Sequence, residues 1–134
     1  MKYQPKIEKE YMTPVEDALR IFGGKWKVRI IGVLSVSEST RYKDIKENLK
    51  GITDTVLAAM LKEMAEDGLV ERKQFDEIPL RVEYALSPRG KSLHAILQDV
   101  CRWARDNLEL QSNYSLLPCQ NCPFLSENQK CTSI

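Results

Sequence analysis

The chain has few of the residues and segments on which several large classes of protein depend. It contains one histidine in 134 residues, no glycine-rich phosphate loop and no zinc-protease motif, so it shows no familiar catalytic constellation. No apolar run approaches the roughly 20 residues that a membrane-spanning helix needs, and Met1–Pro5 contains no apolar signal core. We therefore expect a cytoplasmic protein that is not an enzyme and has no membrane partner.

Cysteine is missing from the first two thirds of the chain. Cys101 lies beside the apolar stripe of a predicted helix, where a cysteine is most simply a small buried side chain. Cys119 and Cys122 have the close spacing of metal and redox sites, and Cys131 follows them, one ligand short of a closed zinc site. Because structural disulfides are rare in the cytoplasm, zinc, an iron–sulfur cluster, a thiol switch and inert thiols all remain open. We expect no cofactor to be required.

The whole chain also lacks a strong charge of either sign. Its net charge is +1, which argues against a nucleic-acid binder, but the charges are unevenly distributed. Residues 20–50 contain eight Lys or Arg and three acidic residues, whereas residues 51–81 contain four and seven. The first segment is therefore a candidate phosphate-binding surface, with an ordinary solvated helix surface as the alternative.

The residues that are present predict helices in the first third. Residues 1–11 are polar and are expected to form an arm. Thr13, Pro14 and Glu16 form a capping box with proline at the first helical position, which predicts a helix start. The apolar residues at helical spacing after it predict one buried face: Val15, Ala18, Leu19 and Phe22.

A second helix is predicted from about Lys25 to Ser35, after the turn at Gly23-Gly24. We expect Lys27 and Arg29 to stay outside. The residues expected in the core are Trp26, Ile30, Val33 and Leu34.

Two further helices lie on either side of Gly51. The first begins at Thr40 or Arg41, and the second is capped by Thr53 and ends before Gly68, which fits a C′ position with positive φ. Two helices joined by such a short turn form a helix-turn-helix, in which the second is the recognition helix. Its predicted core stripe consists of Leu57, Met60, Leu61 and Met64.

Alternating residues predict a β-hairpin after the recognition helix. Its strands are Val70–Phe75 and Arg81–Leu86, and Asp76–Leu80 forms the tip. We call this hairpin the wing. A long helix then begins at Ser87-Pro88 and extends to about Leu110.

The apolar stripe of this long helix is too long for a small core to cover. The simplest partner is the same helix of a second subunit, in a C2 dimer. The predicted interface residues are Leu93, Ile96, Leu97, Val100, Trp103, Ala104 and Leu108.

Together these elements predict a mainly α fold with a small β-hairpin wing (α+β), namely a winged helix-turn-helix. The domain spans residues 12–110, its dimerisation helix covers about 88–110, and residues 111–134 form a cysteine-containing tail. The usual work of this fold is to place one helix in the major groove of DNA.

Several motifs occur in this order along residues 12–110. They are Pro14-Val15-Glu16, Gly23-Gly24-Lys25-Trp26, Arg41-Tyr42-Lys43-Asp44-Ile45, Gly51-Ile52-Thr53, Asp67-Gly68-Leu69-Val70, Pro79-Leu80-Arg81-Val82-Glu83-Tyr84 and Trp103. On these motifs the chain resembles the HxlR-type regulators, bacterial and archaeal relatives of the MarR group. The resemblance implies a homodimer that binds pseudo-palindromic operators and regulates nearby genes, often in response to electrophiles or small metabolites.

One position departs from the family pattern. Many members carry a cysteine just before Pro-Val-Glu, and some use it as a redox or electrophile sensor, but this chain has Thr13 there. The best-understood sensing route of the family is therefore not expected here.

Base contacts are expected on the outer face of the recognition helix. Thr55 and Ala58 lie near its N-terminus, where side chains meet base edges, and Ala58 suits a thymine methyl. Asp54 favours the helix dipole but repels phosphate, so it either accepts from a cytosine amine or points aside. The candidates on this face are Thr53, Asp54, Thr55, Ala58, Ala59 and Lys62.

Basic residues elsewhere are expected to contact phosphate and to supply affinity rather than sequence information. Arg81, beside the wing tip, is the candidate for the minor groove, with an ion pair to Asp76 or Glu77 as the alternative. The phosphate and wing candidates are Lys25, Lys27, Arg41, Lys43, Lys73 and Arg81.

Two other functions compete with a dimeric DNA-binding regulator. The near-zero net charge and the acidic balance of residues 51–81 suit a winged-helix module that binds protein. The Cys119–Cys122 pair suits a thiol or metal redox protein, although such pairs usually open a helix in a βαβ unit, and no such unit is predicted.

Overall fold

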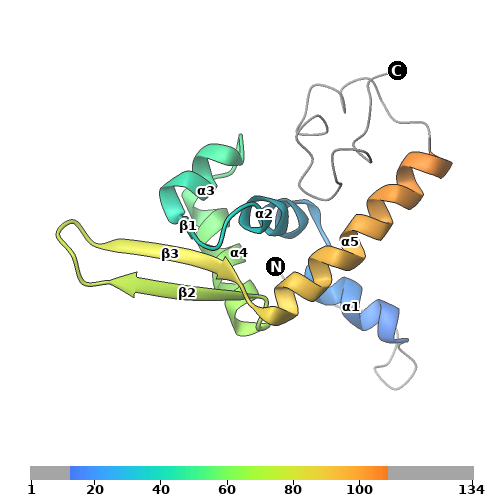
Figure 1. The fold of residues 1–134 in the computed structure, drawn as a ribbon, viewed down its shortest axis with the longest axis horizontal. Coiled ribbons are helices and arrows are strands. Elements are labelled where there is room, and N and C mark those ends of the chain that lie inside the picture. The colour runs from blue at the N-terminus through green and yellow to red at the C-terminus, as the bar shows by residue number, and fades with distance from the viewer. Residues whose placement is uncertain (1–12, 109–134) are drawn as a thin grey trace.

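Five helices and three short strands make up residues 13–108, the part of the chain that the computed structural model describes (Figure 1). In chain order the elements are α1 (Pro14–Phe22), α2 (Lys25–Ser35), β1 (Thr40–Arg41), α3 (Tyr42–Asn48), α4 (Asp54–Glu66), β2 (Val70–Phe75), β3 (Arg81–Leu86) and α5 (Pro88–Asn107). This is a winged helix-turn-helix, with α3 and α4 as the helix-turn-helix and β2–β3 as the wing. No helix in this part of the chain is long and apolar enough to span a membrane.

The sheet has one strand more than predicted. Its order is β1-β3-β2, and all neighbours are antiparallel. β1 pairs Thr40 with Tyr84 and Arg41 with Glu83. The prediction of a two-stranded wing missed β1 because a strand of two residues is too short to show alternation.

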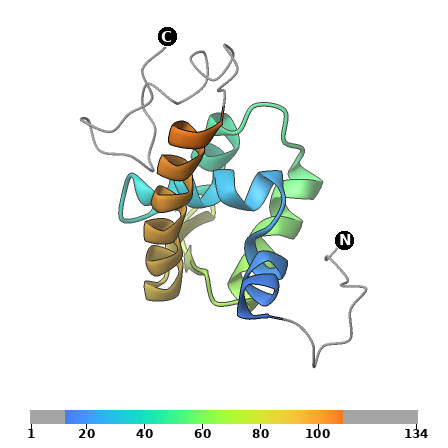
Figure 2. The same ribbon diagram turned by 90° about the vertical axis from the view of Figure 1, so that its right-hand side faces the viewer.

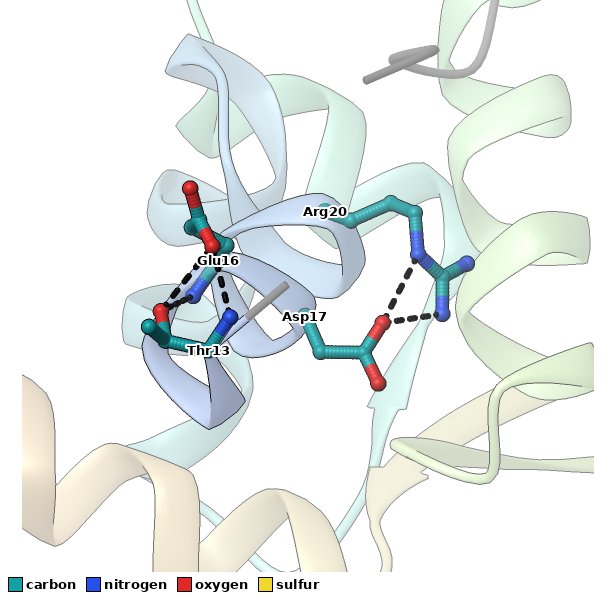
Figure 3. Close-up of polar contacts among 4 residues, drawn as sticks. All are labelled: Thr13, Glu16, Asp17 and Arg20. Atoms are coloured by element: carbon teal, nitrogen blue, oxygen red, sulfur yellow. Dashed lines mark hydrogen bonds and ion pairs between the residues drawn. The ribbon is translucent and has the colours of Figure 1, made fainter. Parts of the chain in front are cut away.

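The helix starts are as the cap residues predicted. Thr13 Oγ1 accepts from the backbone N–H of Glu16 at 3.3 Å, and the Glu16 carboxylate accepts from the N–H of Thr13 at 2.6 Å, which completes the capping box (Figure 3). Thr53 caps α4 and Ser87 caps α5 in the same way, through their hydroxyl oxygens. Local side-chain acceptors therefore determine where these helices begin.

The core lies where α2, α4 and α5 meet the sheet. It takes the inner sides of α2, α3 and α4 and the segment after α4, and its most buried side chains are Ile30, Ile31, Leu34, Ile45, Leu57, Leu61, Met64 and Leu69. The wing extends from one side of this core, and α5 lies on the other side (Figure 1).

The predicted burial of α1 is wrong. This helix, which the structure describes completely, contains no buried residue. Val15 is 67% exposed and Leu19 50% exposed, Ala18 is also exposed, and Phe22 is half-buried. The helix lies at the edge of the molecule (Figure 2), and the other helices already cover the core, so its amphipathic face points outward in a single chain.

The apolar stripe of α5 divides into two parts. Leu97 is buried and Leu93 half-buried, and both pack against the core of their own chain. Leu97, predicted to lie at the interface, is therefore a core residue of its own chain, whereas Leu93 remains partly exposed. Ile96, Val100 and Trp103 are between 52% and 59% exposed. The described helix ends at Asn107, and its predicted extension to about Leu110 runs beyond the described residues.

The first turn of α5 packs directly onto the backbone at the start of β2. A Cβ on Gly90 would lie 2.2 Å from the carbonyl oxygen of Leu69, so only glycine fits there. Arg89 donates to the carbonyl of Asp67 at 2.9 Å, and the Ser87 hydroxyl donates to the carbonyl of Gly68. These contacts fix the long helix to the end of α4.

Candidate nucleic-acid interface

The recognition helix α4 presents an exposed face opposite its core stripe. Leu57, Leu61 and Met64 are buried, while Met60 is half-buried. All the residues predicted for the outer face are exposed, namely Thr53, Asp54, Thr55, Ala58, Ala59 and Lys62. This face is small and mostly uncharged, so Thr55, Ala58 and Lys62 are its principal groups for contact with base edges.

Asp54, the first residue of α4, points its carboxylate toward α3. One oxygen lies 2.9 Å from Lys46 Nζ, and the other accepts from the Tyr42 hydroxyl at 3.1 Å. The Lys46 ammonium, followed by the Tyr42 hydroxyl, lowers the pKa of Asp54 below its usual value. Burial, followed by the hydrogen bond to Asp54, raises the pKa of Tyr42. Of the two predicted alternatives for Asp54, the structure has the one in which it points aside.

Lys27 was predicted to contact phosphate, and the structure contradicts this. Its side chain is 7% exposed, and its Nζ lies 2.7 Å from Glu63 Oε2 on α4 and donates to the carbonyl of Ile21 at 3.3 Å. The ammonium therefore joins α2 to α4 inside the protein and is not available to DNA.

The other cations predicted near α2 and α3 are exposed. Lys25 lies with its Nζ 4.5 Å from the centre of the Trp26 ring, which is half-buried. Arg41 and Lys43 lie at the start of α3, and both are exposed. Their positions are compatible with phosphate contacts.

Arg41 and Lys43 line a groove between α3 and the wing that also contains Arg72. Arg72 pairs with Tyr84 across the hairpin and is exposed, but it was not among the predicted residues. The position of Arg72 follows from the alternation of side chains along β2. Because Val70 is buried, Arg72 two residues later lies on the same face of the sheet. Arg81 and the acidic Glu77 line the same groove, which therefore has four positive side chains and one negative one in its lining.

Arg81 is engaged by acidic groups of the wing. Its Nη2 lies 3.1 Å from Glu77, and its Nε lies 3.2 Å from Glu83, at ion-pair distance although outside hydrogen-bond geometry. Its guanidinium also stacks 3.9 Å from the centre of the Phe75 ring. The structure therefore has the alternative to a minor-groove arginine, an ion pair that shapes the tip. Lys73, the other wing candidate, is exposed, with its Nζ 5.4 Å from the same ring.

Of the cysteines, only Cys101 lies in the described part of the chain, half-buried on α5 beside the core. Cys119, Cys122 and Cys131 lie outside it, so their predicted metal or thiol chemistry stays a prediction. Within residues 13–108, no group of three or more His, Cys, Asp or Glu is arranged to hold a metal ion.

Comparison with known proteins agrees with this geometry. The model of the HxlR-like helix-turn-helix family matches residues 21–112. The chain belongs to the HxlR-like family. Members of this family are DNA-binding transcriptional regulators, and this chain is one of them. The resemblance inferred from the motifs is confirmed.

Individual relatives match this chain over most of their length. The uncharacterized HTH-type transcriptional regulator YdzF of Bacillus subtilis is 42% identical over 68% of this chain and 84% of its own. A putative MarR-family regulator of Porphyromonas gingivalis has the same fold, with a TM-score of 0.67 and 35% identity over 78% of this chain and all of its own. The redox regulator HypR in its oxidized form has a TM-score of 0.65 and 30% identity, covering 73% of this chain and all of its own.

Proposed function

We propose that this HxlR-like regulator binds a pseudo-palindromic operator as a homodimer, with α4 of each subunit in the major groove. The observation that carries this is the exposed outer face of α4 beside a basic groove. Tyr42 joins the two surfaces, because it lines the groove and donates to Asp54 at the start of α4.

The two surfaces divide the work of recognition. Thr55 and Ala58 are proposed to meet base edges, with Lys62 one turn further along. Arg41, Lys43 and Arg72 are proposed to bind phosphates beside the helix and so to set its register. Exposed apolar residues of α5 hold the second subunit, which places two recognition helices on two half-sites.

Anisotropy of labelled duplex DNA tests this proposal. The probe is DNA from the region upstream of the gene for this protein, compared with a scrambled duplex over a salt series. We expect tight binding that prefers the upstream duplex and weakens steeply with salt. Equal, weak and salt-insensitive binding to both duplexes would instead favour the protein-interaction module.

Two substitutions separate the proposed roles. Arg72→Ala should weaken binding to both duplexes alike and reduce the salt slope by about one, because one phosphate contact is lost. Thr55→Ala should mainly change which base pairs are preferred, with a cost of about 1–3 kcal/mol at the position it contacts. Lys91→Ala, which removes one exposed positive charge from α5, is the matched control and should change neither quantity. Wild-type values for both Arg72→Ala and Thr55→Ala would show that the docking model is wrong.

We propose further that this regulator responds to thiol oxidation. The support is its similarity to the redox regulator HypR and the presence of four cysteines in the chain. Treatment with diamide, a thiol oxidant, should change the affinity for the upstream duplex severalfold, and dithiothreitol should restore it. The change should be lost when Cys119 and Cys122 are replaced by serine, and kept in the matched Cys101→Ser variant. Identical affinities before and after diamide would refute a thiol response.

A further inference from the structure

The start of the recognition helix carries a negative charge where a DNA-binding surface would be expected to avoid one. Asp54 is exposed and is the first residue of α4, so its carboxylate lies close to the proposed DNA. An unpaired carboxylate there would repel phosphate. Its two partners, Lys46 and Tyr42, both come from α3, the other helix of the helix-turn-helix.

This three-residue contact joins the two helices at one point. The Tyr42 hydroxyl lies 3.1 Å from the carboxylate and 3.4 Å from the backbone carbonyl of Asp54, so it contacts both the side chain and the main chain at the start of α4. Lys46 is one helical turn beyond Tyr42, and its Nζ reaches the other carboxylate oxygen at 2.9 Å. The first turn of α4 is therefore held from two positions on α3.

We propose that Tyr42 and Lys46 are positioning residues that let the recognition helix distinguish its operator from other DNA. They hold the Asp54 carboxylate aside from the bases and fix the first turn of α4 relative to α3. Thr55 follows Asp54 directly, so the same contact aims Thr55 at the bases. This inference rests on the proposed function, since it concerns how the DNA-binding face is aimed.

The proposal separates specificity from affinity. Loss of the Tyr42 hydroxyl removes a hydrogen bond without changing the net charge, so it should lower affinity for the operator and leave non-specific binding unchanged. Loss of the Asp54 charge should also lower discrimination, but it should raise non-specific affinity because repulsion of phosphate is relieved. If the contact served only the stability of the fold, neither variant would change the ratio of operator affinity to non-specific affinity.

The test uses the full-length protein, the upstream and scrambled duplexes, and four variants. Tyr42→Phe should lower the ratio of upstream to scrambled affinity roughly tenfold with an unchanged salt slope, as expected for a lost hydrogen bond to a charged group. Asp54→Asn should lower the same ratio by a similar factor while binding scrambled DNA more tightly. Lys46→Gln, at a half-exposed position, removes the ion pair with Asp54 and should also lower the ratio of upstream to scrambled affinity. Asp44→Asn removes an equal charge from an exposed position on α3 and should leave the ratio unchanged.

A direct readout accompanies the binding data. The carboxyl pKa of Asp54, followed by NMR titration, should rise in Lys46→Gln and in Tyr42→Phe, because each variant removes a group that lowers it. Ratios within twofold of wild type in Tyr42→Phe, Lys46→Gln and Asp54→Asn, with a wild-type protein that does prefer the upstream duplex, would overturn the inference alone. A wild-type protein without that preference would overturn the proposed function as well.

Discussion

Glu63→Ala is expected to destabilise the protein by about 3 kcal/mol, because it leaves the Lys27 ammonium buried without its counter-charge. The Lys27 side chain is 7% exposed and that of Glu63 is 16% exposed, and their charged atoms lie 2.7 Å apart. The remaining bond from Lys27 to the carbonyl of Ile21, at 3.3 Å, is long and cannot replace a carboxylate. Thermal unfolding followed by circular dichroism should show a midpoint lower by roughly 10 °C.

The controls separate a lost charge partner from a lost side chain. Glu66→Ala removes a carboxylate from the exposed side of the same helix and should change stability by less than about 0.5 kcal/mol. Lys27→Met together with Glu63→Leu replaces the pair by apolar groups and should regain most of the lost stability. If Glu63→Ala unfolds at the wild-type temperature, the Lys27 ammonium must reach water in solution. Lys27 would then again be a candidate for contact with phosphate.

For Lys27, helical spacing predicts burial correctly, whereas the charge of the side chain predicts exposure wrongly. Lys27 shares its face of α2 with side chains that are almost fully buried, which are Ile30, Ile31 and Leu34. That spacing was visible in the sequence and placed Lys27 inside. The prediction followed its charge instead, because the partner that makes burial possible lies on another helix, far along the chain.

The caps illustrate the opposite case. Thr13, Thr53 and Ser87 each bond to a backbone N–H three residues later, so the whole interaction lies within four residues of sequence. The starts of α1, α4 and α5 were therefore predictable, as was the division of the recognition helix into a core face and an outer face. The start of α3 was predicted at Thr40 or Arg41, and the helix begins at Tyr42 after a cap residue that makes no side-chain bond. The ends of the wing strands were also predictable from nearby residues, because the alternation of side chains and the proline at the tip are local features of the sequence.

The wing shows why side-chain partners could not be predicted with equal success. Alternation alone does not say which face of the hairpin meets the body. That choice follows from the burial of Val70 and Leu86, which are paired at the base of the wing. It puts Arg72 in the groove beside Arg41. Arg81 also lines that groove, but Glu77 and Glu83 engage its guanidinium. For this reason Arg72 was not predicted to lie in the groove, and Arg81 was predicted to enter the minor groove although acidic residues of the wing engage it.

Both α1 and α5 have apolar side chains that are exposed in the single chain. Val15 and Leu19 on α1 were expected to be buried within the chain and are exposed. Ile96, Val100 and Trp103 on α5 are also exposed in the single chain, as predicted for a helix whose apolar stripe is too long for one core to cover. Exposed apolar side chains at helical spacing favour a protein partner. A second copy of the chain is the partner that operator symmetry would require.

Val100→Glu is the substitution expected to have the largest effect on DNA binding. Val100 is 52% exposed in the single chain, so a glutamate there costs the fold of one subunit little. In a dimer built on α5, the same carboxylate would be buried beside its symmetry mate, and burial of like charges without partners is strongly unfavourable. A monomer binds one half-site instead of two, and the loss of the linked second contact should weaken operator binding about 100-fold or more.

Sedimentation velocity and anisotropy on the upstream duplex test this prediction together. Val100→Glu should sediment as a monomer, retain the wild-type helix content, and bind the upstream duplex barely better than the scrambled one. Ala95→Glu adds the same charge at an exposed position on a different side of α5 and should remain a dimer with wild-type affinity. A Val100→Glu protein that is still dimeric would place the interface elsewhere, with the exposed residues of α1 as the next candidates. Because two recognition helices act on one operator only when a fixed interface sets their spacing, affinity and oligomeric state should fall together.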